Sequence, residues 1–240
     1  MEPKQLLEFA KIASTTYEDP KNSQKLFKAQ GYNIEKFFDN NGAQGYLLKK
    51  ENTYVLSFRG TQVQQTSDVI ADLSTDKRSE KCGGQVHHGF KKELDKIWSS
   101  IEETLKETSS KLYITGHSLG AAMATIAASR LQSRVVALIT FGSPRVGNQE
   151  FVDNVIIDHF RVQNNCDAVT TVPFHWLGFR HHGCNIYLDY SGKISKLSYM
   201  QKIKDNIKSR IKAMSKFQLF NGVFDHMMYQ YINKLEKLTK

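Results

Sequence analysis

The chain has 240 residues, of which 40% are hydrophobic and 24% are charged, with 4 prolines. This length suits one α/β domain, so we expect residues 1–240 to form a single domain, and the composition excludes a disordered, collagen-like or disulfide-scaffold chain. Lysine and arginine exceed aspartate and glutamate by 33 − 24 = 9 charges, which permits attraction to anionic surfaces without identifying one.

The cysteines and the N-terminal residues bear on the compartment. Three cysteines, Cys82, Cys166 and Cys184, without C-x-x-C spacing exclude a complete disulfide framework and a four-cysteine zinc site, and leave one disulfide pair open. Glu8 and Lys11 interrupt the apolar residues near the N-terminus, so the sequence as given lacks the apolar core of a signal peptide. It therefore predicts a cytoplasmic protein, or a secreted one if a leader has been removed.

Strand-like and helix-like segments alternate along the chain, which is the signature of an α/β fold. Apolar residues at helical spacing and short apolar runs place these elements. The predicted helices cover 6–17, 89–106 and 118–131, with two more at the end of the chain, and the predicted strands cover 43–48, 53–58, 111–115, 135–141, 159–162 and 185–190. The first two strands should pair around the polar turn at 49–52.

A five-residue motif, Gly116–Gly120, fits G-x-S-x-G between an apolar strand and an alanine-rich helix. The two glycines permit a strained turn close to neighbouring backbone, which would lift the Ser118 hydroxyl above the sheet at the N-terminus of the helix. The pattern alone often marks a loop without a role, but the order of strand, turn and helix favours a nucleophile elbow. We expect the neighbouring His117 to point away from the site as a structural hydrogen-bond donor.

A serine hydroxyl becomes a strong nucleophile when a histidine accepts its proton and a carboxylate orients that histidine. In this architecture the acid and then the histidine follow the serine in the chain. His226 lies in a late loop-to-helix region, and Asp167 lies just past a predicted strand end, where α/β sheets place functional groups. Asp189 lies inside a predicted strand and Asp225 adjoins the histidine, so both reach across less easily, although spacing alone leaves the choice among the three acids open. The other histidines after the serine are expected to be structural: His159, His175, His181 and His182.

Seven short motifs stand in the order found in the fungal-type class 3 lipases. They are Phe58–Thr61, Val69–Leu73, Val86–Phe90, Thr115–Gly120, Phe141–Asn148, Asp167–Val169 and Asp225–His226. Together they span most of the chain and are far more specific than any one of them. The resemblance implies an α/β-hydrolase fold, with a mostly parallel central sheet flanked by helices, and a catalytic triad of Ser118, Asp167 and His226.

The resemblance also implies an oxyanion hole formed by the backbone N–H groups of Thr61 and Leu119, to which the Thr61 hydroxyl adds a donor. Such donors make chemical sense because the tetrahedral intermediate carries negative charge on the former carbonyl oxygen. Arg59 and Arg145 are expected to pack and hydrogen-bond within loops. No metal or organic cofactor is expected, since the paired histidines complete no known ligand set with the cysteines.

A segment near 62–73 resembles the short lid of the family. Lids of triglyceride lipases often carry a bulky apolar face, whereas residues 62–68 are mostly polar here. A polar lid gains little from leaving water for an oil surface, because burying unsatisfied amide groups costs free energy. We therefore expect no jump in activity at an oil interface, and esters of shorter or more polar acids are favoured.

Much of the basic excess lies between Lys193 and Lys216, where seven lysines and one arginine oppose one aspartate, a net charge of 7 + 1 − 1 = +7. Apolar residues at helical spacing predict a basic amphipathic helix in this segment. It is either a helix that packs on the core with a solvated basic face or a contact with an anionic membrane surface. Nucleic-acid binding is not expected, because no recognition fold or aromatic stacking platform accompanies the charge. The sequence does not indicate an oligomeric state.

These features predict a serine hydrolase that cleaves carboxylic ester bonds of lipids through an acyl-serine intermediate. One alternative is a carboxylesterase for soluble polar or aryl esters. An alternative from a different class is a catalytically idle hydrolase fold that serves as a membrane-binding or partner-binding module. The complete set of triad and oxyanion candidates argues against idleness, since the loss of any one of them would have favoured it.

Overall fold

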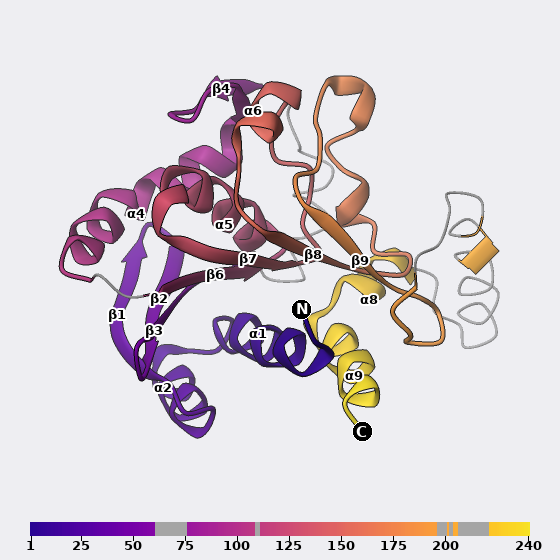
Figure 1. Cartoon of the computed structure of the whole chain (residues 1–240), viewed down its shortest axis with the longest axis horizontal. Helices are drawn as coiled ribbons and strands as arrows, with labels where there is room; N and C mark the ends of the chain where they lie inside the picture. The colour runs from indigo at the N-terminus through magenta and orange to yellow at the C-terminus, as the bar shows by residue number, and fades with distance from the viewer. Residues whose placement is uncertain (61–75, 109–110, 196–200, 202–203, 206–220) are drawn as a thin grey trace.

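The computed structural model of the chain describes residues 1–60, 76–108, 111–195, 201, 204–205 and 221–240 (Figure 1). Three features predicted from the sequence lie outside these residues: the oxyanion candidate Thr61, the lid-like segment near 62–73 and most of the basic segment at 193–216.

The architecture is built on a sheet of seven strands in the order β1-β2-β3-β6-β7-β8-β9. The strands are β1 (Asn33–Asn40), β2 (Ala43–Lys50), β3 (Thr53–Phe58), β6 (Lys111–His117), β7 (Val135–Phe141), β8 (His159–Asn164) and β9 (Cys184–Leu188). β1, β2 and β3 form an antiparallel meander, and from β3 to β9 every neighbouring pair is parallel. A separate hairpin joins β4 (Lys77–Ser79) to β5 (Gln85–His87).

Seven helices surround the sheet in the described part of the chain. They are α1 (Pro3–Thr15), α2 (Pro20–Ala29), α4 (His88–Lys106), α5 (Leu119–Arg130), α6 (Gln149–Asn154), α8 (Asn221–His226) and α9 (Met228–Leu238), with short 3₁₀ turns η1 (Gln132–Arg134), η2 (Val169–Thr171) and η3 (His175–Leu177). None of the helices whose residues are described is both long enough and apolar enough to cross a membrane.

The helices cover both faces of the sheet, and each face has its own apolar core. Figure 1 shows α4 and α5 on one side and α1 and α9 on the other. Side chains alternate across each strand, so Leu112 and Ile114 of β6 pack into the core beneath α4 and α5, whereas Tyr113 packs against the opposite core. Because both faces are buried, the central parallel strand β7 is an almost continuous apolar run, as is typical of parallel sheets.

The predicted elements between residues 43 and 188 are confirmed, with boundaries that shift by a few residues. The apolar stripe of α4, which includes Phe90, Leu94 and Ile101, is fully buried as expected. One prediction was wrong: Asp189 does not lie inside a strand, because β9 ends at Leu188. The Asp189 carboxylate instead accepts hydrogen bonds from the side chains of Ser191 and Ser195, at 2.7 and 2.6 Å, and closes the following turn.

Two elements near the N-terminus were not predicted. β1 is an edge strand whose side chains are mostly exposed, so the alternation that identifies a strand is weak in its sequence. α2 is polar, but it has a recognisable start, because Asp19 caps it by accepting hydrogen bonds from the backbone N–H groups of Lys21 and Asn22, both at 3.1 Å. Pro20 occupies the first helical position, where its missing N–H costs nothing.

Candidate active site

Ser118 lies in a sharp turn between β6 and α5. Its φ of 59° is positive, a conformation that L-amino acids rarely adopt and that costs about 1–3 kcal/mol. A Cβ at Gly116 would overlap the backbone of Gly120, and a Cβ at Gly120 would overlap the backbone of Phe58, so both positions require glycine. The turn therefore has the geometry that the G-x-S-x-G motif predicts, with the serine at the start of a helix.

Asp167 and His226 meet beside this turn, although 59 residues separate them in the chain. The imidazole Nδ1 of His226 lies 2.9 Å from Oδ2 and 3.0 Å from Oδ1 of Asp167, and both side chains are buried. An ionised carboxylate only accepts hydrogen bonds, so Nδ1 carries the proton and Nε2 presents a lone pair. Among the residues that the structure describes, nothing hydrogen-bonds to that buried Nε2. This is the tautomer of a general base.

Gly142 makes room for the acid–base pair at the end of β7. Its φ is +55°, and a Cβ at this position would lie 2.7 Å from Oδ2 of Asp167 and 2.8 Å from Nδ1 of His226. The backbone N–H of Ser118 donates to the carbonyl of Phe141, at 3.1 Å, which joins the serine turn to the same strand end. Three consecutive ends of parallel strands, β6, β7 and β8, thus deliver the candidate groups to one edge of the sheet.

Two further donors hold the Asp167 carboxylate in place. The backbone N–H of Val169 donates to Oδ1 at 2.9 Å, and the hydroxyl of Tyr231 donates to Oδ2. Tyr231 belongs to α9 and is fully buried. Burial, followed by the negative charge of Asp167, raises the pKa of Tyr231 well above its usual value, so the phenol stays protonated and acts as a donor. Tyr231 was not predicted from the sequence, where it is only one of several apolar positions on the last helix.

His117 lies directly against His226. The two ring centroids are 4.3 Å apart, and Nε2 of His117 lies 2.7 Å from the backbone carbonyl of His226. A carbonyl only accepts, so Nε2 donates and Nδ1 accepts from the hydroxyl of Tyr17 at 2.8 Å. Burial lowers the pKa of His117 well below its usual value, which keeps the ring neutral. The expected structural donor is confirmed, but the ring does not point away from the site: it packs against the candidate base and fixes its backbone.

The other acids that sequence spacing left open serve different purposes. Asp189 closes the turn after β9, as described above. The carboxylate of Asp225 accepts weak hydrogen bonds from Cys166 N at 3.3 Å and Asn165 Nδ2 at 3.4 Å, neither of which comes from the imidazole of His226. Burial raises the pKa of Asp225 to about 6, against the opposing charge of Lys234.

Other histidines and arginines considered in the sequence have structural partners, as follows. His159 bonds Thr140 and His182, with ring-nitrogen contacts of 2.8 and 3.1 Å. Arg59 donates to the side chain of Gln44, and Arg145 donates to loop carbonyls, as expected. Within the described residues, no group of three or more His, Cys, Asp or Glu side chains could hold a metal ion. The three cysteines, all described, form no disulfide with one another.

The oxyanion candidates are only partly described. Leu119 is the first residue of α5, so its N–H belongs to the helix N-terminus, where backbone donors lack partners within the helix. These donors and the helix dipole favour negative charge beside Ser118. The arrangement as a whole can supply a nucleophile, a base with a fixed tautomer and at least one oxyanion donor.

Comparisons with known proteins agree with this geometry. The family described as Lipase (class 3) matches residues 55–176. The lipase of Rhizopus niveus is 29% identical over 209 residues, which cover 79% of this chain and 51% of that protein, so the chain spans about half the length of such relatives. The secreted mono- and diacylglycerol lipase LIP1 of Malassezia globosa is 30% identical over 213 residues, covering 76% of this chain and 69% of that protein.

Solved structures show the same arrangement of strands and helices. Lipase II from Rhizopus niveus aligns with a TM-score of 0.67 and 27% identity, over 78% of this chain and 80% of that one. A triacylglycerol lipase described as having a serine protease triad at its catalytic centre aligns over 93% of this chain and 92% of that one, with a TM-score of 0.73 and 23% identity. The family match, together with these folds, shows that the chain belongs to the class 3 lipases and has the α/β-hydrolase fold.

Proposed function

We propose that this protein is a serine hydrolase that cleaves carboxylic ester bonds of lipids through an acyl-serine intermediate. The observation that carries the proposal is the buried pair of Asp167 and His226, with Nδ1 bonded to the carboxylate and Nε2 left as a lone pair. This pair lies beside a serine in a strained turn at a helix N-terminus. A structural histidine would be expected to have both ring nitrogens bonded, as His117 has.

In the proposed mechanism, Oγ of Ser118 attacks the ester carbonyl carbon while Nε2 of His226 takes the hydroxyl proton. The carbonyl oxygen becomes an oxyanion, which accepts hydrogen bonds from the backbone N–H groups of Leu119 and Thr61. The carbon–oxygen bond to the alcohol then breaks, and the imidazolium returns its proton to the leaving alcohol. Water attacks the acyl-serine by the same steps in reverse order and releases the acid.

The partners of the acid–base pair support this cycle. When His226 takes the proton, its imidazolium lies between the Asp167 carboxylate, which has three donors, and the neutral ring of His117. The positive charge is therefore stabilised from the side of Asp167 alone. Tyr231 and Val169 hold that carboxylate against Nδ1 of the imidazole, and His117 fixes the backbone from which the imidazole extends. Little reorganisation is then needed when the proton moves.

Glycerolipids with few acyl chains are the substrate class that we propose. Relatives from Fusarium solani and Malassezia globosa are named as secreted mono- and diacylglycerol lipases. The polar residues 62–68 also favour small or polar esters over an oil phase. A carboxylesterase for soluble esters and an idle membrane-binding module are the alternatives.

One assay separates these possibilities. A chain-length series of nitrophenyl esters should be run beside monoacylglycerol, diacylglycerol, triacylglycerol and phospholipid, together with a fluorophosphonate probe of serine reactivity. We expect labelling at Ser118 and turnover of mono- and diacylglycerol. Turnover confined to nitrophenyl acetate and butyrate would instead support a soluble carboxylesterase. A folded protein that is neither labelled nor active would support the idle module.

Three further properties are proposed on less direct grounds. We propose that residues 1–240 act as one domain, because two cores share one sheet and α1 contacts α9, with Lys11 and Glu236 forming an ion pair at 3.0 Å. We propose secretion rather than a cytoplasmic location, because the two relatives above are named as secreted. A leader identified in the gene, or activity in the culture medium, would support secretion.

We also propose, from the sequence alone, that the basic segment 193–216 attracts the protein to anionic membranes. Each basic residue near such a surface contributes about 1 kcal/mol, and salt screens the attraction. Replacing Lys204, Lys208 and Lys212 by glutamine should weaken the salt-sensitive part of vesicle binding and leave the turnover of soluble esters unchanged. Vesicle binding that is insensitive to salt in both proteins would contradict this role.

A further inference from the structure

A pair of aromatic side chains stands out from the surface close to the candidate active site. Phe174 and Trp176 are 43% and 76% exposed. Their rings stack almost parallel, with centroids 4.3 Å apart and an interplanar angle of 8°. Stacking on one another hides only one face of each ring, so a large apolar surface stays in contact with water. Trp176 also has an indole N–H, which suits a boundary between water and an apolar phase.

Three cations hold the segment that carries this pair. Arg145 donates to the carbonyl oxygens of Thr171 and Pro173, the latter at 3.1 Å. Arg180 donates to those of His175 and Phe179, at 2.8 and 2.9 Å. Lys77 donates to that of Leu177, at 2.7 Å, and its ammonium lies over the ring of Phe179, 4.5 Å from the centroid. Alternate carbonyls from 171 to 179 therefore point toward positive charge, and the aromatic pair projects from a braced segment.

Within the described residues, no acidic side chain forms an ion pair with these three cations. Across the part of the chain that the structure describes, no carboxylate lies within 4.0 Å of Lys77, Arg145 or Arg180. Carbonyl oxygens are neutral acceptors, so their hydrogen bonds do not cancel the charge. Burial and then the charge of Arg180 lower the pKa of Arg145, which is what two close positive groups without a counter-charge should do. The aromatic pair thus has a positive surround.

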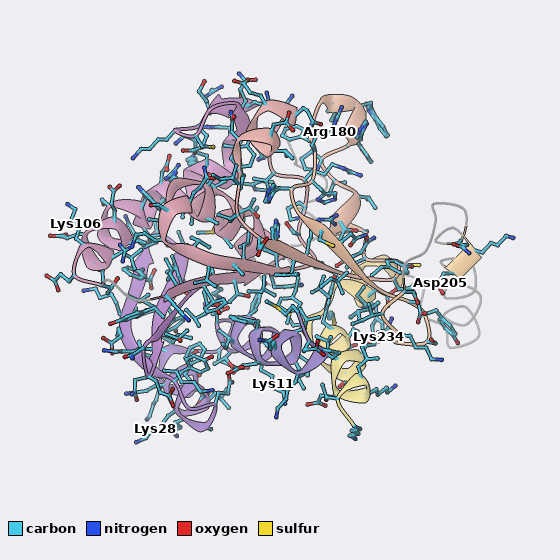
Figure 2. All side chains as sticks on the ribbon, viewed as in Figure 1. Lys11, Lys28, Lys106, Arg180, Asp205 and Lys234 are labelled. Carbon is cyan, nitrogen blue, oxygen red and sulfur yellow. The ribbon has the colours of Figure 1, made fainter. Side chains whose placement is uncertain are left out.

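This surface is linked to the acid–base pair through the chain. The segment begins at η2, whose Val169 N–H and Thr170 hydroxyl bond the side chain and the carbonyl of Asp167. Arg145 comes three residues after Gly142, at which a Cβ would meet Asp167 and His226. Figure 2 shows Arg180 toward the opposite edge of the molecule from Lys11 and Lys28. A partner docked on the aromatic pair would therefore contact the segment that also orients Asp167, away from α1.

We propose that Phe174 and Trp176 insert into an anionic lipid surface, with Lys77, Arg145 and Arg180 facing the lipid headgroups. Aromatic rings favour the interfacial layer of a bilayer, and basic side chains around them add attraction to anionic lipid. A protein partner would need its own acidic and apolar complement, whereas an anionic membrane offers both in one layer. The inference rests on the proposed function, because a lipid ester is the reason for docking, but the binding itself can be measured without turnover.

The test uses the full chain with Ser118→Ala, so that lipid is not consumed, and vesicles of equal parts phosphatidylcholine and phosphatidylglycerol. The variant Phe174→Ser with Trp176→Ser should bind these vesicles roughly ten-fold or more less tightly, because two aromatic side chains no longer leave water. The matched control is Ile156→Ser, since Ile156 is 84% exposed but belongs to a different segment, after α6. It should bind as the parent does. Circular dichroism and thermal melting establish that all three proteins fold.

Fluorescence locates the contact directly. The chain has 2 tryptophans, and Trp98 is only 7% exposed, so Trp176 reports the environment of the segment. Adding vesicles should shift its emission to the blue, and brominated lipid should quench it. Vesicles of phosphatidylcholine alone should bind more weakly, and the difference should shrink as salt is added.

The inference is overturned if the double variant binds as tightly as the parent, or if brominated lipid leaves Trp176 unquenched while the protein is bound. The latter result, with binding abolished by the lysine-to-glutamine changes in segment 193–216, would assign docking to that segment. The two proposals fail separately: an intact Ser118 that reacts with no ester or probe ends the proposed function, and the vesicle assay with Ser118→Ala is unaffected by that result.

Discussion

Asp167 and Trp176 lie nine residues apart in one segment, yet their surroundings are opposite. The Asp167 carboxylate is fully buried and receives three donors, from His226, Tyr231 and Val169. Trp176 is 76% exposed, among cations that lack acidic partners in the described structure. A carboxylate that orients a histidine needs all its hydrogen bonds made within the protein. A surface that binds a partner needs exposed apolar area and charge that is not paired within the protein. The segment 167–180 provides both kinds of environment.

The largest expected effect comes from removing the nucleophile at the buried end of this segment. Ser118→Ala should lower ester turnover by roughly 10⁶-fold and leave the fold intact, because only one oxygen is lost. His226→Ala should cause a loss of similar size. His182→Ala, which removes a structural histidine, is the control and should stay active. Turnover of a soluble nitrophenyl ester checks all three, and an active, folded Ser118→Ala would end the serine mechanism.

The acids come next. Asp167→Asn should lower turnover by roughly 10⁴-fold, because an amide presents either the wrong donor or the wrong tautomer to His226. Asp189→Asn and Asp225→Asn should retain most activity, since their carboxylates serve a turn and a loop. The same ester assay ranks them. A larger loss for Asp189 than for Asp167 would mean that the acid has been assigned to the wrong strand end.

Tyr231→Phe tests whether the orientation of the buried Asp167 carboxylate depends on its third hydrogen-bond donor. A hydrogen bond to a charged group contributes about 1.5–3 kcal/mol, so the variant should unfold more easily and lose roughly ten-fold in kcat. The matched control is Tyr32→Phe, which removes a hydroxyl that donates to the carboxylate of Glu8 in α1, at 2.9 Å. That variant should keep its kcat. If Tyr231→Phe lowers only stability, the tyrosine supports the fold without positioning the acid.

The smallest effect concerns Asp225, whose side chain is buried like that of Asp167 but accepts only weak hydrogen bonds. Its pKa is about 6 in the folded protein and 3.8 in its ordinary state, so the unfolded chain loses this proton first as pH rises. Stability should therefore fall by about 1–3 kcal/mol between pH 4 and pH 6 and stay level above that range. Denaturant unfolding of Asp225→Asn should lack this decline.

Asp189 supplies the opposite sign as a control. Burial acts to raise its pKa, but hydrogen bonds from Ser195 and Ser191 prevail and lower it. Its contribution to stability is present above the ordinary pKa of 3.8 and is lost as the pH falls below it. Asp189→Asn should therefore reduce stability at neutral pH and matter less in acid. Identical pH profiles for the two variants would contradict both assignments.

The sequence predicted the parts of the site that depend on local pattern. The elbow at Ser118 follows from two glycines between an apolar strand and an alanine-rich helix. Its place after a strand made Asp167 a candidate, but spacing left Asp189 and Asp225 open as well, and only the resemblance to the class 3 lipases implied the choice. Tyr231 and Tyr17 could not be predicted in this way, because their partners lie 64 and 100 residues away in the chain. A buried tyrosine on a helix looks the same in sequence whether its hydroxyl meets a backbone carbonyl or a triad acid.

The surface was harder still to predict. Aromatic residues at 174 and 176 are visible in the sequence, but their exposure is not. The hydrogen bonds to this segment from Lys77 and Arg145 come from the β4–β5 hairpin and the loop after β7. Residues 193–216 stand out in the sequence because their basic residues are closely spaced along the chain. Three cations from three separate segments leave no run in the sequence and become a cluster only in the fold.

The candidate site draws on residues near both ends of the described chain, so its contacts form in a fixed order during synthesis. Tyr17 leaves the ribosome early, but its bond to His117 cannot align His226 until residue 226 has been made, and Tyr231 must follow before Asp167 has its last donor. α1 must also wait for α9 before the sheet is covered on that side. A nascent chain that ends before His226 therefore carries the serine elbow without its candidate base, and one that ends before Tyr231 leaves the Asp167 carboxylate short of one donor.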